Sequence, residues 1–327
     1  MKTIYAATLL FTSLTNAEVI TIHIRPSATD PSIRTYDLPH DVYVNRDIVV
    51  DKKPGLPEDR HELVLWITGT HIKGTPYRNG AVAFCNLAAD LGYHVVALTY
   101  PNDVAAAQFR KDSNPSTFGV FRMAIIQGGR TKYISIEPSE SIQNRLIKLL
   151  QYLQENRPKD NWGQFLNRSG SIKWESIAVA GQSQGGGHAA LIGIQYRTAR
   201  VLCFGSPKDY NTALNEPAKW YHRPSATPKN RFFAFNHLQD PMGCTPEQLR
   251  ENLKALELDA FGPPANVDHE SMPYHHSRIL FTGYPEVTVT GEESEGALAA
   301  HTSVISGKYS DGRKQVWTYM LTETQKP

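Results

Sequence analysis

Residues 176–192 read SIAVAGQSQGGGHAALI, an apolar run of strand length followed by a glycine-rich turn and the opening of a helix. The turn contains Gly181-Gln182-Ser183-Gln184-Gly185, which matches the pattern G-x-S-x-G. A strand that reverses sharply into a helix leaves little room two positions before and after the serine, so small residues are needed there. The stretch therefore predicts an elbow that lifts the hydroxyl of Ser183 above a sheet.

Apolar runs of strand length recur on both sides of this stretch and alternate with helical patterns. The runs cover residues 63–67, 94–100, 201–204, 231–235 and, more weakly, 278–281. Between them, residues 82–91 and 140–155 carry apolar side chains at helical spacing, and Glu140 favours the positive N-terminus of the second helix. Such alternation predicts a mainly parallel sheet with helices on both faces. The expected fold class is α/β, in one domain over residues 18–327.

Two stretches interrupt the alternation. Residues 103–138 are rich in polar and turn residues, and residues 207–229 contain four prolines and the cluster Trp220-Tyr221-His222. Insertions of this length at strand ends often form substrate-binding loops and lids. The alternative is surface packing without a function, and the sequence does not separate the two.

An elbow serine needs an acid and a base from later in the chain, in the order serine, acid, histidine. Asp240 follows the strand predicted at residues 231–235, where its carboxylate could accept the imidazole Nδ1 proton. Asp209 is the alternative, because some hydrolases carry the acid one strand earlier. Either aspartate could instead cap a turn by bonding its own backbone.

The base is expected at His301, the one histidine beyond the last predicted strand. Small residues surround it, which would let the backbone approach the serine closely. His237 lies too close to Asp240, and three others precede the last predicted strand, namely His269, His275 and His276. His188 lies on the helix that leads away from Ser183, so we expect it to pack beneath the elbow.

An oxyanion formed during attack on a carbonyl needs two backbone N–H donors. One comes from the residue after the nucleophile, here Gln184. The other comes from the turn after an early strand, where Thr70 is the expected donor and His71 the alternative. The turn could also be an ordinary glycine turn.

Several motifs together resemble a small, largely uncharacterised group of α/β-hydrolases. They are ITGT at residues 67–70, GYHVVALTY at 92–100, GQSQGGGHAA at 181–190 and AHTS at 300–303. The chain has Gln182 and Thr68 where members of the group often have histidine and proline. The resemblance covers most of the chain and implies an α/β-hydrolase fold with esterase-like activity.

The N-terminus carries Lys2, an apolar run over residues 4–14 and a small-residue site ending at Ala17. This order is typical of a signal peptide, so we expect residues 1–17 to be removed and the protein to be secreted. The alternative is a buried element at residues 4–14. Asn167 begins a glycosylation acceptor pattern, which matters only in a pathway that adds such glycans.

Composition narrows the range of partners. The 34 basic and 32 acidic residues leave a net charge of +2 without long charged runs, which argues against nucleic acid. No later apolar stretch reaches the length of a membrane span. We expect no metal and no cofactor, because the chain shows neither a zinc-type spacing nor a dinucleotide fingerprint. Of the three cysteines, Cys85 and Cys203 lie in apolar surroundings and are expected to be free core thiols.

The sequence thus predicts a serine hydrolase that cleaves a small-molecule or polymeric carboxylic ester through an acyl-enzyme on Ser183. Two alternatives stay open. A peptidase could use the same residues, and a binding protein could retain the scaffold without catalysis.

Overall fold

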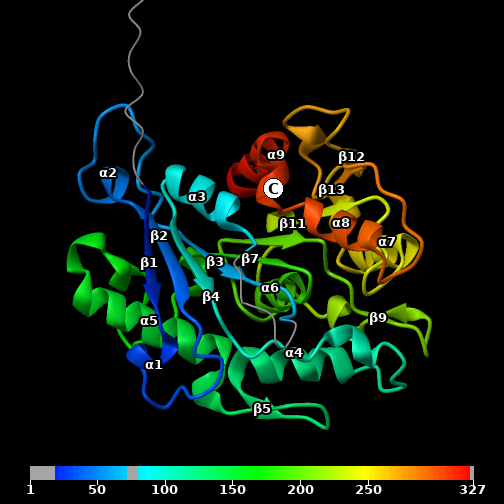
Figure 1. Cartoon of the computed structure of the whole chain (residues 1–327), viewed down its shortest axis with the longest axis horizontal. Helices are drawn as coiled ribbons and strands as arrows, with labels where there is room; N and C mark the ends of the chain where they lie inside the picture. Colours follow the sequence, from blue (N-terminus) through cyan, green and yellow to red (C-terminus); the bar gives the residue numbers. More distant parts are fainter. Residues whose placement is uncertain (1–18, 72–79, 325–327) are drawn as a thin grey trace, which may run out of the picture.

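The computed structural model describes residues 19–71 and 80–324 (Figure 1). A nine-stranded sheet crosses this part of the chain in the order β1-β2-β4-β3-β7-β8-β11-β13-β12. Neighbouring strands are parallel from β4 to β12, whereas β2 runs antiparallel to both β1 and β4. The strands are β1 Val19–Ile24, β2 His40–Asn45, β3 Leu63–Ile67, β4 His94–Leu98, β7 Ile177–Gln182, β8 Arg200–Phe204, β11 Phe232–His237, β12 Ala265–Asn266 and β13 Ile279–Thr282.

Helices cover both faces of this sheet, as Figure 1 shows. Helices α3 and α9 pack on one face, and α4, α5 and α6 pack on the other. Two short hairpins, β5–β6 and β9–β10, lie outside the sheet. The longer helices are α3 Val82–Asp90, α4 Thr117–Gln127, α5 Ile142–Asn156, α6 Gln184–Gln195, α7 Pro246–Ala255, α8 Glu295–Ser303 and α9 Ser310–Thr322. The shorter elements are α1 Pro26–Thr29, α2 Arg46–Val49, β5 Gly129–Arg130, β6 Ser135–Ile136, β9 Tyr210–Asn211 and β10 Glu216–Pro217.

Burial on both faces explains why the central strands read as continuous apolar runs. All five residues of β3 are buried, and so are all five of β4. On the α3 and α9 side, Phe84 lies at the centre of an aromatic cluster, with ring centroids 5.2 Å from Phe204 and 5.9 Å from Trp317. These rings join the sheet to both helices, since burial of aromatic side chains contributes strongly to a core.

The predicted fold class is confirmed, and each predicted strand is present within a few residues of its expected bounds. The start of α5 is an exception. Glu140 lies before the helix, and Ser141 is the N-cap, whose hydroxyl accepts the Asn144 N–H. Glu140 instead accepts the backbone N–H groups of Arg34 and Thr35. Its carboxylate also pairs with Arg145 of α5, so Glu140 stays beside the start of the helix but lies outside its first turn.

The sequence patterns missed several elements. The edge strands β1 and β2 and the last helix α9 were not expected, and the insertion at residues 103–138 contains the regular helix α4 together with the β5–β6 hairpin. The predicted signal peptide, residues 1–17, lies outside the described residues and stays a prediction. Asn167 is exposed, and its glycosylation also stays a prediction.

Cys85, Cys203 and Cys244 are all free and buried. The expectation of free core thiols at Cys85 and Cys203 is confirmed. Within residues 19–71 and 80–324, no helix combines the length and apolarity that crossing a bilayer requires. The same residues contain no cluster of histidine, cysteine and acidic side chains suited to a metal ion.

Gly312 offers a simple test of α9. It lies inside the helix, and a Cβ added there would meet no atom within 4 Å. Alanine is favoured over glycine in a helix interior because glycine loses more backbone entropy on folding. Gly312→Ala should therefore raise the free energy of unfolding by about 0.5–1 kcal/mol. Chemical denaturation measures this, and a loss of stability would contradict a helix at this position.

Candidate active site

Ser183 occupies the sharp turn between β7 and α6. Its backbone has φ 56° and ψ −124°, a conformation that costs a non-glycine residue energy and is maintained only by its surroundings. The Ser183 N–H donates to the Phe204 carbonyl at 2.8 Å, which fixes the turn to β8. A Cβ at Gly185 would lie 2.0 Å from the Ile67 carbonyl oxygen, and one at Gly181 would lie 2.4 Å from the Gly185 carbonyl carbon. The tightness of the turn therefore requires glycine at both positions.

His301 and Asp240 form a buried pair. The Nδ1–H of His301 donates to Asp240 Oδ2 at 2.8 Å, because a carboxylate can only accept. Asp240 lies in the turn after β11, and its side chain is fully buried. His301 lies on α8, which Ser294 caps by accepting the Ala297 N–H. With its Nδ1 protonated, the imidazole has its lone pair on Nε2.

Two observations place His301 close to the turn that contains Ser183. A Cβ at Gly205 would lie 3.3 Å from both Cε1 and Nδ1 of the His301 ring, and Gly205 follows the residue whose carbonyl binds Ser183. Gly205 also has φ +54°, so both its conformation and the adjacent ring favour glycine. On the other side, Gln182 Nε2 donates to the His301 carbonyl at 3.5 Å. The structure thus pairs His301 with Asp240 and places the His301 ring beside residues that adjoin the Ser183 turn.

Asp240 has a further neighbour that sequence reasoning missed. Lys208 Nζ lies 2.6 Å from Asp240 Oδ2, the oxygen that also accepts the His301 N–H. The other carboxylate oxygen accepts the Met242 N–H at 3.0 Å. Burial raises the pKa of Asp240, but His301 and Lys208 outweigh this and lower it to about 2. In the sequence, Lys208 is a lysine that follows a proline, and no motif around it indicates a role in the site.

The turn at residues 68–71 lies against the elbow. A Cβ at Gly69 would lie 3.1 Å from the Ser183 Cβ. Asn102 holds the turn, since its Nδ2 donates to the Gly69 carbonyl at 2.7 Å and its own carbonyl accepts the His71 N–H at 3.0 Å. The alternative oxyanion donor His71 is therefore engaged, whereas the Thr70 N–H has no partner among the described residues.

Gln184 has a role for its side chain that the sequence did not indicate. Its Oε1 accepts the Ala106 N–H at 2.7 Å, and its Nε2 donates to the Val104 carbonyl at 3.0 Å. These two bonds attach the start of the insertion at residues 103–138 to the elbow. The Gln184 N–H is the first of α6 and has no acceptor within the helix.

The structure places the alternative acid, Asp209, in a different role. Its carboxylate forms a two-bond ion pair with Arg122 of α4, at 2.6 and 2.5 Å, and it also accepts the Trp220 Nε1–H. Arg122 and Asp209 are almost fully buried, and Arg122 donates in addition to the Gln184 carbonyl at 2.8 Å. The two insertions therefore meet beneath the elbow, and Asp209 supports the turn instead of pairing with His301.

His188 lies in the same region beneath the elbow, as the sequence predicts. It is fully buried, and its ring packs edge-on against Tyr100 with the centroids 5.6 Å apart. Burial, and then the charge of Arg122, lower the pKa of His188 well below its usual value. The imidazole is therefore neutral and acts in packing.

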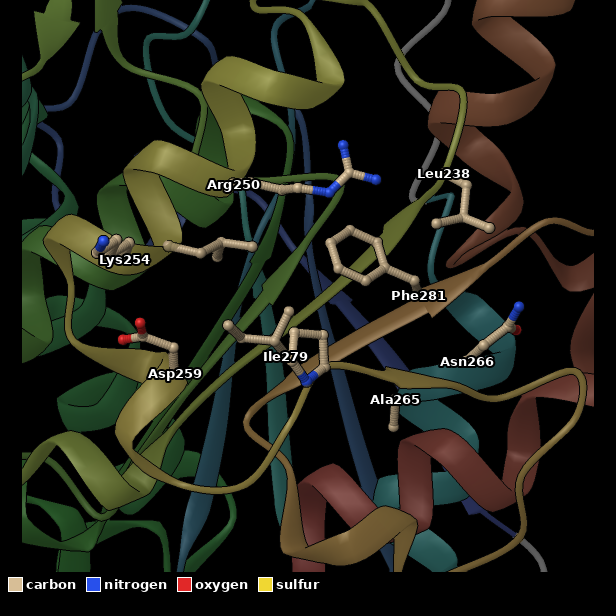
Figure 2. A pocket seen from close by; sticks show the side chains of 10 residues that line it. Leu238, Arg250, Lys254, Asp259, Ala265, Asn266, Ile279 and Phe281 are labelled. Atoms are coloured by element: carbon tan, nitrogen blue, oxygen red, sulfur yellow. The ribbon is translucent and has the colours of Figure 1, made fainter.

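A separate pocket of about 390 Å³ lies between α7 and strand β13 (Figure 2). Its walls are mainly apolar, with Phe281 and Ile279 opposite the charged side chains of Arg250 and Lys254. None of the candidate residues Ser183, Asp240, His301, Gln184 and Thr70 lines it. The pocket is therefore distinct from the place where Ser183 could act.

No family model matches the chain, and no curated protein matches it. Among solved structures it is similar to an alpha-beta serine hydrolase homologue from Coxiella burnetii, at 15% identity and a TM-score of 0.40, over 87% of this chain and 92% of that one. A bacterial heroin esterase matches at 13% identity and a TM-score of 0.38, over 95% and 87%. Oligopeptidase B from Leishmania major matches at 10% identity and a TM-score of 0.40, over 93% of this chain and 37% of that chain.

The sheet order and the serine turn between a central parallel strand and its helix give the fold directly. The fold is that of the α/β-hydrolases. In this fold the turn after the central strand presents a nucleophile, and later strands supply the acid and the base. Ser183 after β7, Asp240 after β11 and His301 after β13 occupy these places in chain order.

Proposed function

We propose that this protein is a serine hydrolase that cleaves a carboxylic ester through an acyl-enzyme on Ser183. The observation that carries the proposal is the strained Ser183 turn with the buried His301–Asp240 pair beside it. A strained residue held by glycines on both sides is typical of a site where a side chain must be presented. We assign to Ser183 the role of nucleophile, to His301 that of base and to Asp240 that of acid.

The proposed reaction begins when His301 Nε2 removes the Ser183 proton as Oγ attacks the ester carbonyl. The imidazolium that forms is stabilised by Asp240, which stays ionised throughout. Collapse of the tetrahedral intermediate breaks the bond to the alkoxy group, which leaves as the alcohol with the proton from His301. Water then attacks the acyl-enzyme with the same base, and the acid product leaves Ser183.

The oxyanion of the tetrahedral intermediate is proposed to accept the N–H groups of Gln184 and Thr70. Gln184 heads α6, where the helix dipole also favours negative charge. Thr70 follows Gly69, which packs against Ser183, and its N–H has no other partner among the described residues. Because Asn102 bonds the turn on both sides of Thr70, the donor is held before substrate arrives.

An ester is proposed as the substrate because the chain's motifs resemble a group for which esterase-like activity is expected. A peptidase would use the same three residues and the same oxyanion donors, so the bond cleaved is a question for the assay. A panel of short p-nitrophenyl esters and matched p-nitroanilides separates the two. Esters should be hydrolysed, and turnover of the anilides alone would replace the ester proposal by a peptidase.

Incubation with a fluorophosphonate should label the protein once, on Ser183. The reagent phosphonylates only a serine that a nearby base activates, so surface serines serve as internal controls. Peptide mapping by mass spectrometry locates the adduct, and Ser183→Ala should abolish both the label and ester turnover. An unlabelled wild-type protein, or a label at another serine, would refute the assignment and would favour a binding protein on a hydrolase scaffold.

A further inference from the structure

The Asp240 carboxylate has an unusual set of partners. Oδ1 accepts one backbone N–H, from Met242, while Oδ2 receives both the His301 N–H at 2.8 Å and the Lys208 ammonium at 2.6 Å. Lys208 Nζ also donates to the Asp240 backbone carbonyl at 3.3 Å. The lysine therefore holds the aspartate at two points, and its charge competes with that of a protonated His301 for a single oxygen.

Lys208 is built into the site and is not a surface side chain that happens to lie nearby. Its side chain is 9% exposed, whereas the lysine of the surface pair Lys53–Asp47 is 51% exposed. A Cβ at Gly243 would lie 3.6 Å from both Cβ and Cδ of Lys208, so the aliphatic part of the lysine packs on this turn. Burying an ammonium costs desolvation energy that only a close counter-ion offsets. Asp240 is that counter-ion.

Three other titratable groups lie near Asp240 or Lys208, and none of the three supplies a positive charge to the Asp240 carboxylate. The Cys244 thiol is neutral, because burial raises its pKa to about 12. Burial lowers the pKa of His237, whose Nε2 bonds the Pro285 carbonyl. Glu292 lies near Lys208 but is engaged by Arg110 at 2.8 and 2.9 Å and by the Gly243 N–H. Among the residues that the structure describes, Lys208 is thus the lysine or arginine that forms an ion pair with Asp240.

We propose that Lys208 is a positioning residue that orients Asp240 toward His301 and competes with the imidazole for the charge of the shared carboxylate oxygen. The proposal rests on the proposed role of Ser183 and His301. Two positive charges that share one carboxylate oxygen repel each other, which disfavours the imidazolium in the resting enzyme. Without Lys208, the negative charge of Asp240 acts on the imidazole alone, and His301 should take up its proton at higher pH.

The test compares the wild-type protein with Lys208→Met, Lys208→Gln and Lys208→Arg. The acid limb of the pH profile of kcat/KM for a soluble short ester should move to higher pH by about one unit in Lys208→Met and Lys208→Gln. Lys208→Arg keeps the charge and should retain the wild-type limb. Lys314→Met removes an exposed lysine of α9 and is the matched control, with no expected shift.

A purely structural lysine would give a different result. Its loss would lower the melting temperature and kcat at every pH and leave the limb in place, which would overturn the proposal. NMR titration of the His301 imidazole provides a second measurement that does not depend on turnover. A shift there without fluorophosphonate labelling of Ser183 would support the role of Lys208 and refute the hydrolase. Labelling of Ser183 without a shift in the pH profile or in the NMR titration would support the hydrolase and refute the role of Lys208.

Discussion

Replacing His301 with alanine should lower kcat for a short ester roughly a million-fold, if the residue is the base for Ser183. In the proposed mechanism the side chains of Ser183, His301 and Asp240 act as a unit, so removing one disables the others. The double variant Ser183→Ala/His301→Ala should therefore be no slower than either single variant. Asp240→Ala should cost less, on the order of ten-thousand-fold, because the imidazole remains but loses its orientation and its counter-charge.

The control for this experiment is His222→Gln. His222 is an exposed histidine in the second insertion and has no place in the proposed chemistry. Its variant should keep the wild-type kcat and the wild-type melting temperature. A loss below ten-fold in His301→Ala, or losses that multiply in the double variant, would show that His301 is not the base.

Arg122→Met should lower the free energy of unfolding by about 3–5 kcal/mol. The substitution removes the partner of Asp209 and leaves that carboxylate buried with an uncompensated charge. It also removes the donor to the Gln184 carbonyl, which supports the elbow. Thermal and chemical denaturation measure the loss, and we expect ester turnover to fall as well, because the Gln184 carbonyl and N–H flank the same Cα and a shift of the carbonyl displaces the N–H.

Lys314→Met is the comparison for this prediction, because the Lys314–Asp311 pair is exposed. Exposed pairs contribute about 0–1 kcal/mol, so its loss should be small. The Arg122→Met/Asp209→Leu double variant should regain part of the stability that Arg122→Met loses, since it removes the unpaired charge as well. Equal stability of Arg122→Met and the wild-type protein would contradict a structural role for the pair.

The fold could be predicted from residues whose neighbours lie close in the sequence. The elbow glycines follow from the shape of one turn, and the central strands follow from apolar runs that are buried on both faces. The edge strand β1 is not among the predicted strands, although apolar and polar residues alternate from Ile20 to Ile24, and its pairing with β2 becomes visible only in the fold. Helix α4 was missed because its buried face includes Arg122, a charged residue where a pattern search expects an apolar one.

Some residues of the candidate site can likewise be predicted from the sequence, and others cannot. Ser183, Asp240 and His301 are predicted from a motif and from chain order, and the structure shows the bond between His301 and Asp240. Lys208 and the pairing of Asp209 with Arg122 depend on contacts between residues 32 and 87 positions apart, for which a single sequence has no signal. The choice between Asp240 and Asp209 thus needed the fold, because only the fold shows which carboxylate a guanidinium already occupies.

The two bonds from the Gln184 side chain have a consequence for engineering. The residue that supplies one proposed oxyanion donor also binds Val104 and Ala106 through its side chain. A displacement of the first insertion would therefore also displace the elbow. A loop transplanted into residues 103–109 to change the substrate must still present one carbonyl and one N–H to Gln184. Grafts that lack this pair would alter the rate of the chemical step together with the choice of substrate.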